Sequence, residues 1–170
     1  MRHKLLLLYS WFVRIFLFPW PDVPIIMRFR GWLYGLGMKK CGKDFQITHD
    51  AILKGLENIF IGNYVYIADM TILMGSGEIH IGDNVQIGPH CTLVSSDHKF
   101  INGIFSKHQG EKGTIIIEQG SWIAANCVVA KGAVLPERSV LAACSFLSKH
   151  MESPRSMYGG VPAKFIKDLS

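Results

Sequence analysis

Residues 117–147 read IEQGSWIAANCVVAKGAVLPERSVLAACSFL, and every sixth residue of this stretch is aliphatic. The same spacing recurs upstream, between residues 47 and 93. The full set of aliphatic sites is Ile47, Leu53, Ile61, Ile67, Leu73, Ile81, Ile87, Leu93, Ile117, Ile123, Val129, Leu135, Leu141 and Leu147. A helix turns by about 100° per residue, so this spacing would spread the side chains over three helix faces. An extended chain keeps evenly spaced side chains on one side, and the sequence therefore predicts short strands.

A second row of residues lies four positions after each aliphatic site, and most of its members are small. This row comprises Ala51, Glu57, Val65, Thr71, Gly77, Val85, Cys91, Asp97, Ser121, Cys127, Ala133, Ser139, Ser145 and Met151. Small side chains suit an interior that narrows where short strands turn a corner. Three hexads make one triangular coil of about 18 residues, and stacked coils form a parallel β-helix. We expect about five coils, with bulged corners near residues 59–61 and 79–81, where the period slips. The general preference for right-handed crossovers leaves the hand of the coil open.

Residues 99–114 (KFINGIFSKHQGEKGT) interrupt the repeat without a period of their own. A long aperiodic insertion must project from the wall, so we expect an arm here. His98 lies where the arm leaves the wall. An imidazole titrates near neutral pH, which suits a general base; the alternative is an ordinary loop histidine.

The first forty residues form a basic, aromatic leader. Residues 1–43 contain eight Lys and Arg but one Asp, a net charge of +7, whereas the remainder carries −2. Nine of the 19 aromatic residues precede residue 36. The apolar run at residues 5–18 is too short to span a bilayer. We expect residues 3–36 to form helices lying on an anionic membrane surface, or to pack on the body or a sister subunit. A nucleic-acid partner is not expected, because no basic stripe continues into the body.

Composition narrows the remaining classes. The chain is 49% hydrophobic and 18% charged, which excludes disorder. Four cysteines without a CxxC pair disfavour a disulfide scaffold or a zinc site and favour a reducing compartment. Cys91 and Cys127 fall on the small inward row, so we interpret them as compact buried side chains. Gly37, Gly42 and Lys43 have the spacing of a phosphate loop, but Asp44 follows where that motif needs a hydroxyl.

Three segments carry a family resemblance. IGDNVQIGPHCTLVSSDH (81–98), IEQGSWIAANCVVAKGAV (117–134) and GGVPAKFIK (159–167) resemble the hexapeptide-repeat acyltransferases, specifically their galactoside, maltose and polysaccharide O-acetyltransferase branch. The resemblance covers about residues 40–168. It implies an all-β, left-handed parallel β-helix over residues 41–170, preceded by the leader at 1–40. It also implies a homotrimer with acetyl-CoA bound in each cleft between neighbouring prisms.

The resemblance assigns roles to individual residues. His98 matches the catalytic histidine, and Trp122 matches a tryptophan that flanks the pantetheine arm. The backbones of Ala124 and Ala125 match a pair that contacts the thioester. Residues expected along the rest of the cofactor are Ala143 and Ser148 in the last coils, and Lys164 and Lys167 near the CoA phosphates.

The acceptor site departs from the galactoside enzymes, which have Asn at the position of Ala68 and Asp at that of Ser76. Their sugar contacts therefore do not transfer. We expect Asp69 to contact the substrate or to orient the imidazole of His98. A backbone carbonyl could orient it equally well.

The expected activity is transfer of an acetyl group from acetyl-CoA to a sugar hydroxyl, without a metal. The sugar would belong to a bacterial surface polysaccharide or a lipid-linked precursor, on the cytoplasmic side of the cytoplasmic membrane. One alternative is N-acylation of an amino sugar. Another is a metal-dependent hydratase of carbonic-anhydrase type, although the spacing of His80, His90, His98 and His108 does not resemble that family. A non-catalytic scaffold is a third alternative.

Overall fold

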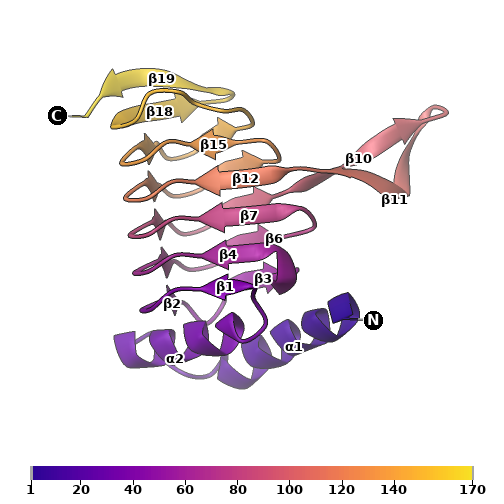
Figure 1. Cartoon of the computed structure of the whole chain (residues 1–170), viewed down its shortest axis with the longest axis vertical. Helices are drawn as coiled ribbons and strands as arrows, with labels where there is room; N and C mark the ends of the chain where they lie inside the picture. The colour runs from indigo at the N-terminus through magenta and orange to yellow at the C-terminus, as the bar shows by residue number, and fades with distance from the viewer. Residues whose placement is uncertain (1, 170) are drawn as a thin grey trace.

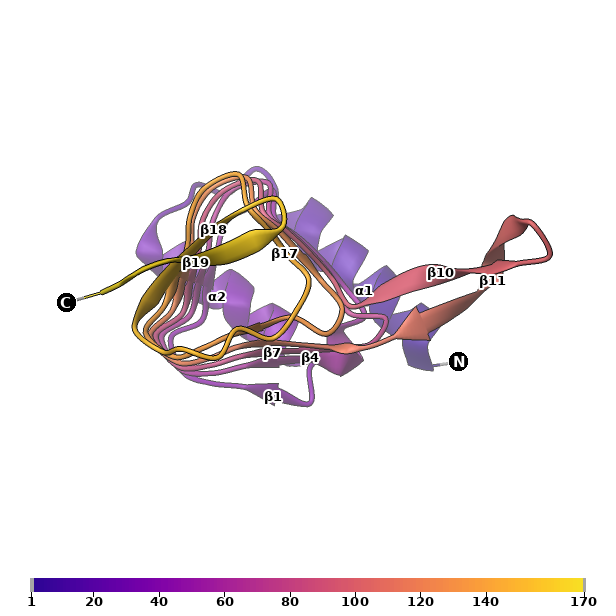
Figure 2. The same ribbon diagram turned by 90° about the horizontal axis from the view of Figure 1, so that it is seen from above.

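The structure, a computed structural model, describes residues 2–169 apart from the side chain of His108. Two helices lie beneath a three-sided stack of coils, and a hairpin projects from the stack (Figure 1). The helices are α1 (Arg2–Leu17) and α2 (Pro24–Gly35). Viewed from above, the coils superimpose as a triangle (Figure 2). This architecture confirms the predicted parallel β-helix.

Each side of the triangle is a stack of short parallel strands. Sheet 1 contains β1 (Lys40–Cys41), β4 (Ile59–Ile61), β7 (Glu78–Ile81), β12 (Thr114–Ile117) and β15 (Val134–Leu135). Sheet 2 contains β2 (Gln46–Ile47), β5 (Tyr66–Ile67), β8 (Gln86–Ile87), β13 (Trp122–Ile123), β16 (Val140–Leu141), β18 (Ser156–Gly160) and the antiparallel β19 (Ala163–Asp168). Sheet 3 contains β3 (Ile52–Lys54), β6 (Ile72–Met74), β9 (Thr92–Val94), β14 (Val128–Ala130) and β17 (Phe146–Leu147).

The core follows the predicted aliphatic row. All fourteen sites are exposed by 3% or less. They stack in register from coil to coil, as Ile47, Ile67 and Ile87 do in sheet 2. Early coils are 20 residues long, since Ile61 pairs with Ile81, and later coils have the expected 18, since Ile117 pairs with Leu135. A 3₁₀ turn at Leu56–Asn58 takes up the extra residues at the first expected bulge.

The predicted second inward row is wrong at Glu57 and at Asp97. At the first position the neighbouring Leu56 is buried instead, and the Glu57 carboxylate hydrogen-bonds His3. The side chain of Asp97 is exposed, because the chain leaves the coil at Ser96 instead of residue 99. From there β10 (Ser96–Ile101) and β11 (Ile104–Lys112) form an antiparallel hairpin, which is the predicted arm. Lys131 Nζ lies 2.8 Å from Asp97 Oδ2 and 2.7 Å from Glu111 Oε2, so it ties the two strands of the arm to the wall. Hydrogen bonds from Lys131 lower the pKa of both carboxyls.

The leader closes one end of the stack. Val13, Leu17 and Tyr34 are buried against the first coils. Gly31 permits this contact, because a Cβ there would lie 2.0 Å from the carbonyl oxygen of Phe45. Among residues 2–169, no helix is long and apolar enough to cross a membrane.

A buried arginine clamps the leader to the first coil. Arg30 is 0% exposed, and its Nη1 donates to Asp22 Oδ1 at 2.9 Å and to the Ile47 carbonyl at 2.6 Å. Its Nη2 donates to the Trp20 carbonyl at 3.1 Å. One guanidinium thus joins the connection between α1 and α2 to strand β2.

Replacing this arginine should destabilise the protein strongly. Removing one member of a buried pair leaves its partners unsatisfied, so we expect Arg30→Met to lower the free energy of unfolding by about 3 kcal/mol. Arg28→Met is the matched control. Arg28 pairs with Asp44 but is half exposed, so its loss should cost less than about 1 kcal/mol. Urea denaturation followed by circular dichroism measures both, and equal losses would show that Arg30 is no clamp.

Candidate functional site

His98 lies on β10 at the base of the arm, with its side chain exposed. Its Nδ1 lies 3.0 Å from the carbonyl oxygen of Ser106. A carbonyl can only accept a hydrogen bond, so Nδ1 carries a proton, and in the neutral imidazole the lone pair then lies on Nε2. This is the state that a general base requires.

The base of the arm fixes the position of His98. Its backbone pairs with Gly110, and a Cβ at Gly110 would lie 2.3 Å from the Asp97 carbonyl oxygen. The Lys131 salt bridges flank the same pairing. The histidine is therefore held by strand pairing and charge, although it lies outside the coil.

A second group of predicted residues lies at the corner between sheets 2 and 3. Trp122, 49% exposed, stands on the outer side of sheet 2 between Gln86 and Val140. Ala124 is buried and its N–H donates to Leu141.

Ala125 and Ala143 are stacked neighbours at the same corner. The N–H of Cys144 donates to the Ala125 carbonyl at 3.0 Å. Within residues 2–169 the Ala125 N–H has no acceptor. A backbone donor without a partner beside an exposed tryptophan is a suitable contact for a carbonyl oxygen.

The remaining predicted cofactor residues lie toward the last coils. Lys164 and Lys167 are exposed on β19 and pair across the final hairpin with Gly159 and Met157. Ser148 is exposed just after β17.

One chain does not bring these groups together. The arm that carries His98 leaves the corner between sheets 3 and 1, whereas Ala125 lies at the corner between sheets 2 and 3. Sheet 3 separates the two corners (Figure 2). A site that uses both therefore needs a second copy of the chain.

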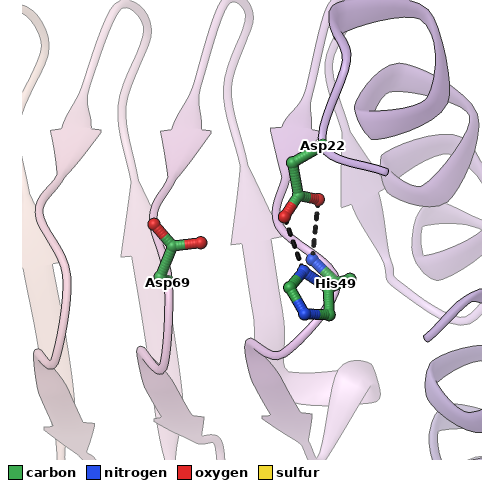
Figure 3. A group of neighbouring side chains, drawn as sticks. All are labelled: Asp22, His49 and Asp69. Atoms are coloured by element: carbon green, nitrogen blue, oxygen red, sulfur yellow. Dashed lines mark hydrogen bonds and ion pairs between the residues drawn. The ribbon is translucent and has the colours of Figure 1, made fainter. Parts of the chain in front are cut away.

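Asp69 lies at the same corner as Ala125, in an earlier coil, and within one chain it is not the partner of His98. Instead it belongs to a group with Asp22 and His49 (Figure 3). Asp22 Oδ2 lies 2.5 Å from His49 Nδ1, and the His49 N–H donates to Asp22 Oδ1 at 2.9 Å. Nothing in the sequence pattern signals this Asp22–His49 pair, because packing of the leader on the first coil creates it.

Within residues 2–169, this is the one group of three potential metal ligands whose ligand atoms lie within 4.8 Å of one another. Among the side chains that the structure describes, the histidines of the hydratase alternative do not gather in one chain. His80 Nε2 forms a hydrogen bond of 2.8 Å with Glu78 Oε2, and its ring stacks on that of Phe60 with the centroids 4.3 Å apart. His90 occupies a left-handed turn, and the side chain of His108 lies outside the described residues.

Cys91 and Cys127 are fully buried. Their sulfurs lie 3.0 Å from the Ala124 carbonyl and 3.1 Å from the Ala142 carbonyl. The hydrogen bond with Cys127 and, to a smaller extent, burial raise the pKa of the Cys91 thiol. Both cysteines lie in the small inward row, as the sequence indicated, and neither reaches the surface.

Comparison with known proteins gives the chain its relatives. No family model matches it. It is 27% identical over 113 residues to the galactoside O-acetyltransferase of Escherichia coli K12, covering 66% of this chain and 55% of that relative. It is 25% identical over 158 residues to WcaF of the same strain, named for an acetyltransferase of colanic acid biosynthesis, covering 93% and 84%. The chain thus spans about half of the first relative and most of the second.

A solved structure has the same fold. A hexapeptide-repeat acetyltransferase from Vibrio cholerae O1 biovar eltor, in complex with acetyl coenzyme A, superposes with a TM-score of 0.84 at 22% identity. The match covers 98% of this chain and 88% of the other. Both relatives are named acetyltransferases, and the chain has the parallel β-helix fold of this hexapeptide-repeat acetyltransferase.

Proposed function

We propose that this protein transfers an acetyl group from acetyl-CoA to a sugar hydroxyl. The observation that carries the proposal is His98, whose Nδ1 donates to the Ser106 carbonyl and leaves Nε2 as the proton acceptor of the neutral imidazole, at the root of the hairpin arm. The relatives supply the reaction class, since they are named as acetyltransferases of sugars and polysaccharide. The acceptor would be a unit of surface polysaccharide or a lipid-linked precursor.

The site is completed in a homotrimer. Sheet 3 separates His98 from Ala125 in one chain, and its outward positions are mostly apolar: Ile52, Ile72, Thr92, Val128 and Phe146. Such a face suits packing against another copy. A rotational arrangement would then bring the arm of one chain to the sheet 2–sheet 3 corner of the next.

Acetyl-CoA would lie along this corner. Trp122 offers an exposed ring to the pantetheine arm, and Lys164 and Lys167 offer positive charge to the phosphates. Ala124, Ala143 and Ser148 line the path. Lysine supplies charge without the bidentate geometry of arginine.

The reaction is direct transfer in a ternary complex. His98 Nε2 takes the proton of the sugar hydroxyl while that oxygen attacks the thioester carbonyl. The Ala125 N–H stabilises the oxyanion. The carbon–sulfur bond then breaks, the ester forms, and the proton passes from His98 to the departing CoA sulfur. Asp69, near the acceptor end of the same corner, would accept a hydrogen bond from another sugar hydroxyl.

The leader would hold the enzyme on the inner face of the cytoplasmic membrane. Apolar side chains form an exposed row on each helix: Leu5, Leu8, Phe12, Ile15 and Phe16 on α1, and Ile25, Phe29, Trp32 and Leu36 on and just after α2. Basic residues lie on the same two helices. In a trimer whose axis runs along the stack, all three leaders would lie at one end and could contact one flat surface.

Loss of the base should remove most activity. We expect His98→Ala to lower kcat by about 10²- to 10⁴-fold, because a positioned general base contributes that much. Acetyl-CoA turnover is measured with a panel of sugars, amino sugars and polyprenyl-linked glycans. Circular dichroism and gel filtration check that the variant keeps its fold. Turnover within about threefold of the unsubstituted enzyme would contradict the assignment.

Loss of a cofactor contact should weaken acetyl-CoA binding. We expect Trp122→Ala and Lys164→Ala to raise the KM for acetyl-CoA more than they lower kcat, because both contacts are remote from the thioester. Lys4→Ala, at the opposite end of the molecule, serves as the charge control and should leave both constants unchanged. A change confined to the acceptor KM would show that the cofactor lies on a different face.

Loss of the apolar row should release the protein from membranes. We expect Phe12→Ser combined with Phe16→Ser to weaken flotation with anionic vesicles at least about tenfold, because each buried ring contributes about 1.5–3 kcal/mol. The control is Phe100→Ser combined with Phe105→Ser, which removes two exposed rings from the arm tip. Equal flotation of all three proteins would exclude the leader as the membrane contact.

A further inference from the structure

A pocket lies between the leader and the first coil. Its volume is about 610 Å³, and its walls come from the second half of α2, the turn after it, β1 and the next turn as far as Phe45. None of the residues assigned above to catalysis or to acetyl-CoA binding lines it. The proposed reaction therefore leaves this pocket unexplained.

The pocket is positively charged. Arg28, Lys39 and Lys43 line it, with Asp44 as the only acid among its lining residues. Asp44 is already paired, because Arg28 Nε donates to its Oδ1 at 2.6 Å. Within residues 2–169 neither lysine forms a salt bridge. Each lies instead near an aromatic ring: Lys39 Nζ is 5.5 Å from the Phe60 centroid, and Lys43 Nζ is 5.1 Å from that of Tyr64. The two ammonium charges are therefore not paired in a salt bridge, and the acid that interacts with Lys39, Glu78, is itself hydrogen-bonded to His80.

The other part of the pocket is apolar and open to the leader surface. Trp32 and Leu36 line the pocket and are 58% and 63% exposed. They belong to the apolar row of α2 that begins with Ile25 and Phe29. A ligand with an anionic group in the pocket could therefore place a hydrocarbon chain along this row without leaving the protein surface.

We propose that this pocket binds the phosphate head group of an anionic phospholipid, with the acyl chains lying along Trp32 and Leu36. The proposal rests on the membrane placement given above and adds a defined head-group site to it. Lysine ammonium groups bind phosphate as point charges. An anionic phospholipid fits better than two other ligands. Inorganic phosphate would leave the apolar row exposed to water, and a zwitterionic head group would place its own positive charge beside the two lysines.

A short-chain lipid tests the pocket without a bilayer. Dihexanoyl phosphatidylglycerol, below its micelle concentration, is titrated calorimetrically into the full-length protein. We expect saturable binding, and binding about 25-fold weaker in the Lys39→Gln, Lys43→Gln double variant, since each lysine near a lipid phosphate contributes about fivefold. Arg2→Gln combined with Lys4→Gln removes the same charge from α1 and should change the affinity less than about twofold. Equal losses in the two variants would overturn the site.

Two further ligands distinguish a lipid site from a site for any anion. Inorganic phosphate and dihexanoyl phosphatidylcholine should each bind at least about tenfold more weakly than the anionic lipid, because one lacks the chains and the other has no net charge. Trp32→Ala should weaken binding of the anionic lipid and leave that of inorganic phosphate unchanged. Equal affinity for inorganic phosphate and the lipid would identify a free-anion site and overturn the proposal.

Vesicle flotation separates this proposal from the membrane placement on which it rests. If the full chain floats with phosphatidylglycerol vesicles but fails to bind the short-chain lipid, the pocket assignment is wrong and the leader contact stands. If it binds the short-chain lipid in the lysine-dependent manner but does not float, the leader contact is wrong and the pocket stands.

Discussion

Stacking of successive coils is the constraint on which the structure depends. A coil made of strands of two to four residues cannot bury its own aliphatic side chains, so each is covered only by the coils above and below. Ile67 is buried because Ile47 and Ile87 lie in register on either side. The interior is thereby filled along its whole length, and binding and catalysis are confined to corners, outer faces and insertions.

This constraint explains the location of the candidate site. At the sheet 2–sheet 3 corner, stacking uses the N–H groups of Ala124 and Cys144 and leaves that of Ala125 without a partner among the described residues. The arm leaves from a different corner, because it interrupts the path from sheet 3 to sheet 1. The packing thus places Ala125 and His98 on separate edges of one prism, and the proposed site, which uses both residues, would be shared between copies of the chain.

The sequence predicts those features of the fold that follow from the six-residue spacing of its aliphatic residues. The aliphatic row, the small row, the arm and the helical leader could all be located, because each either keeps the spacing of six or breaks it. Asp97 was misplaced because the spacing of six, continued past Ser95, assigns it to the inward row. In the structure the chain has already left the coil there and pairs with β11. The contact of His98 with Ser106 depends on hairpin register, and the pairing of Asp22 with His49 depends on how the leader docks. Neither leaves a local pattern.

The two ends of the stack are closed differently. At the last coil, Tyr158 takes the place of an aliphatic residue, and its hydroxyl donates to the Ser153 carbonyl beneath the final hairpin. At the first coil, α1 and α2 cover the aliphatic row with Val13, Leu17 and Tyr34. A cap needs an apolar inner face, but solubility favours a polar outer face. The leader is apolar on its inner face and on its outer face, and capping accounts only for the inner one. The outer face, with its basic residues and the cationic pocket beside Trp32, is the surface that we propose binds phospholipid, because such a partner would match both its charge and its hydrophobicity.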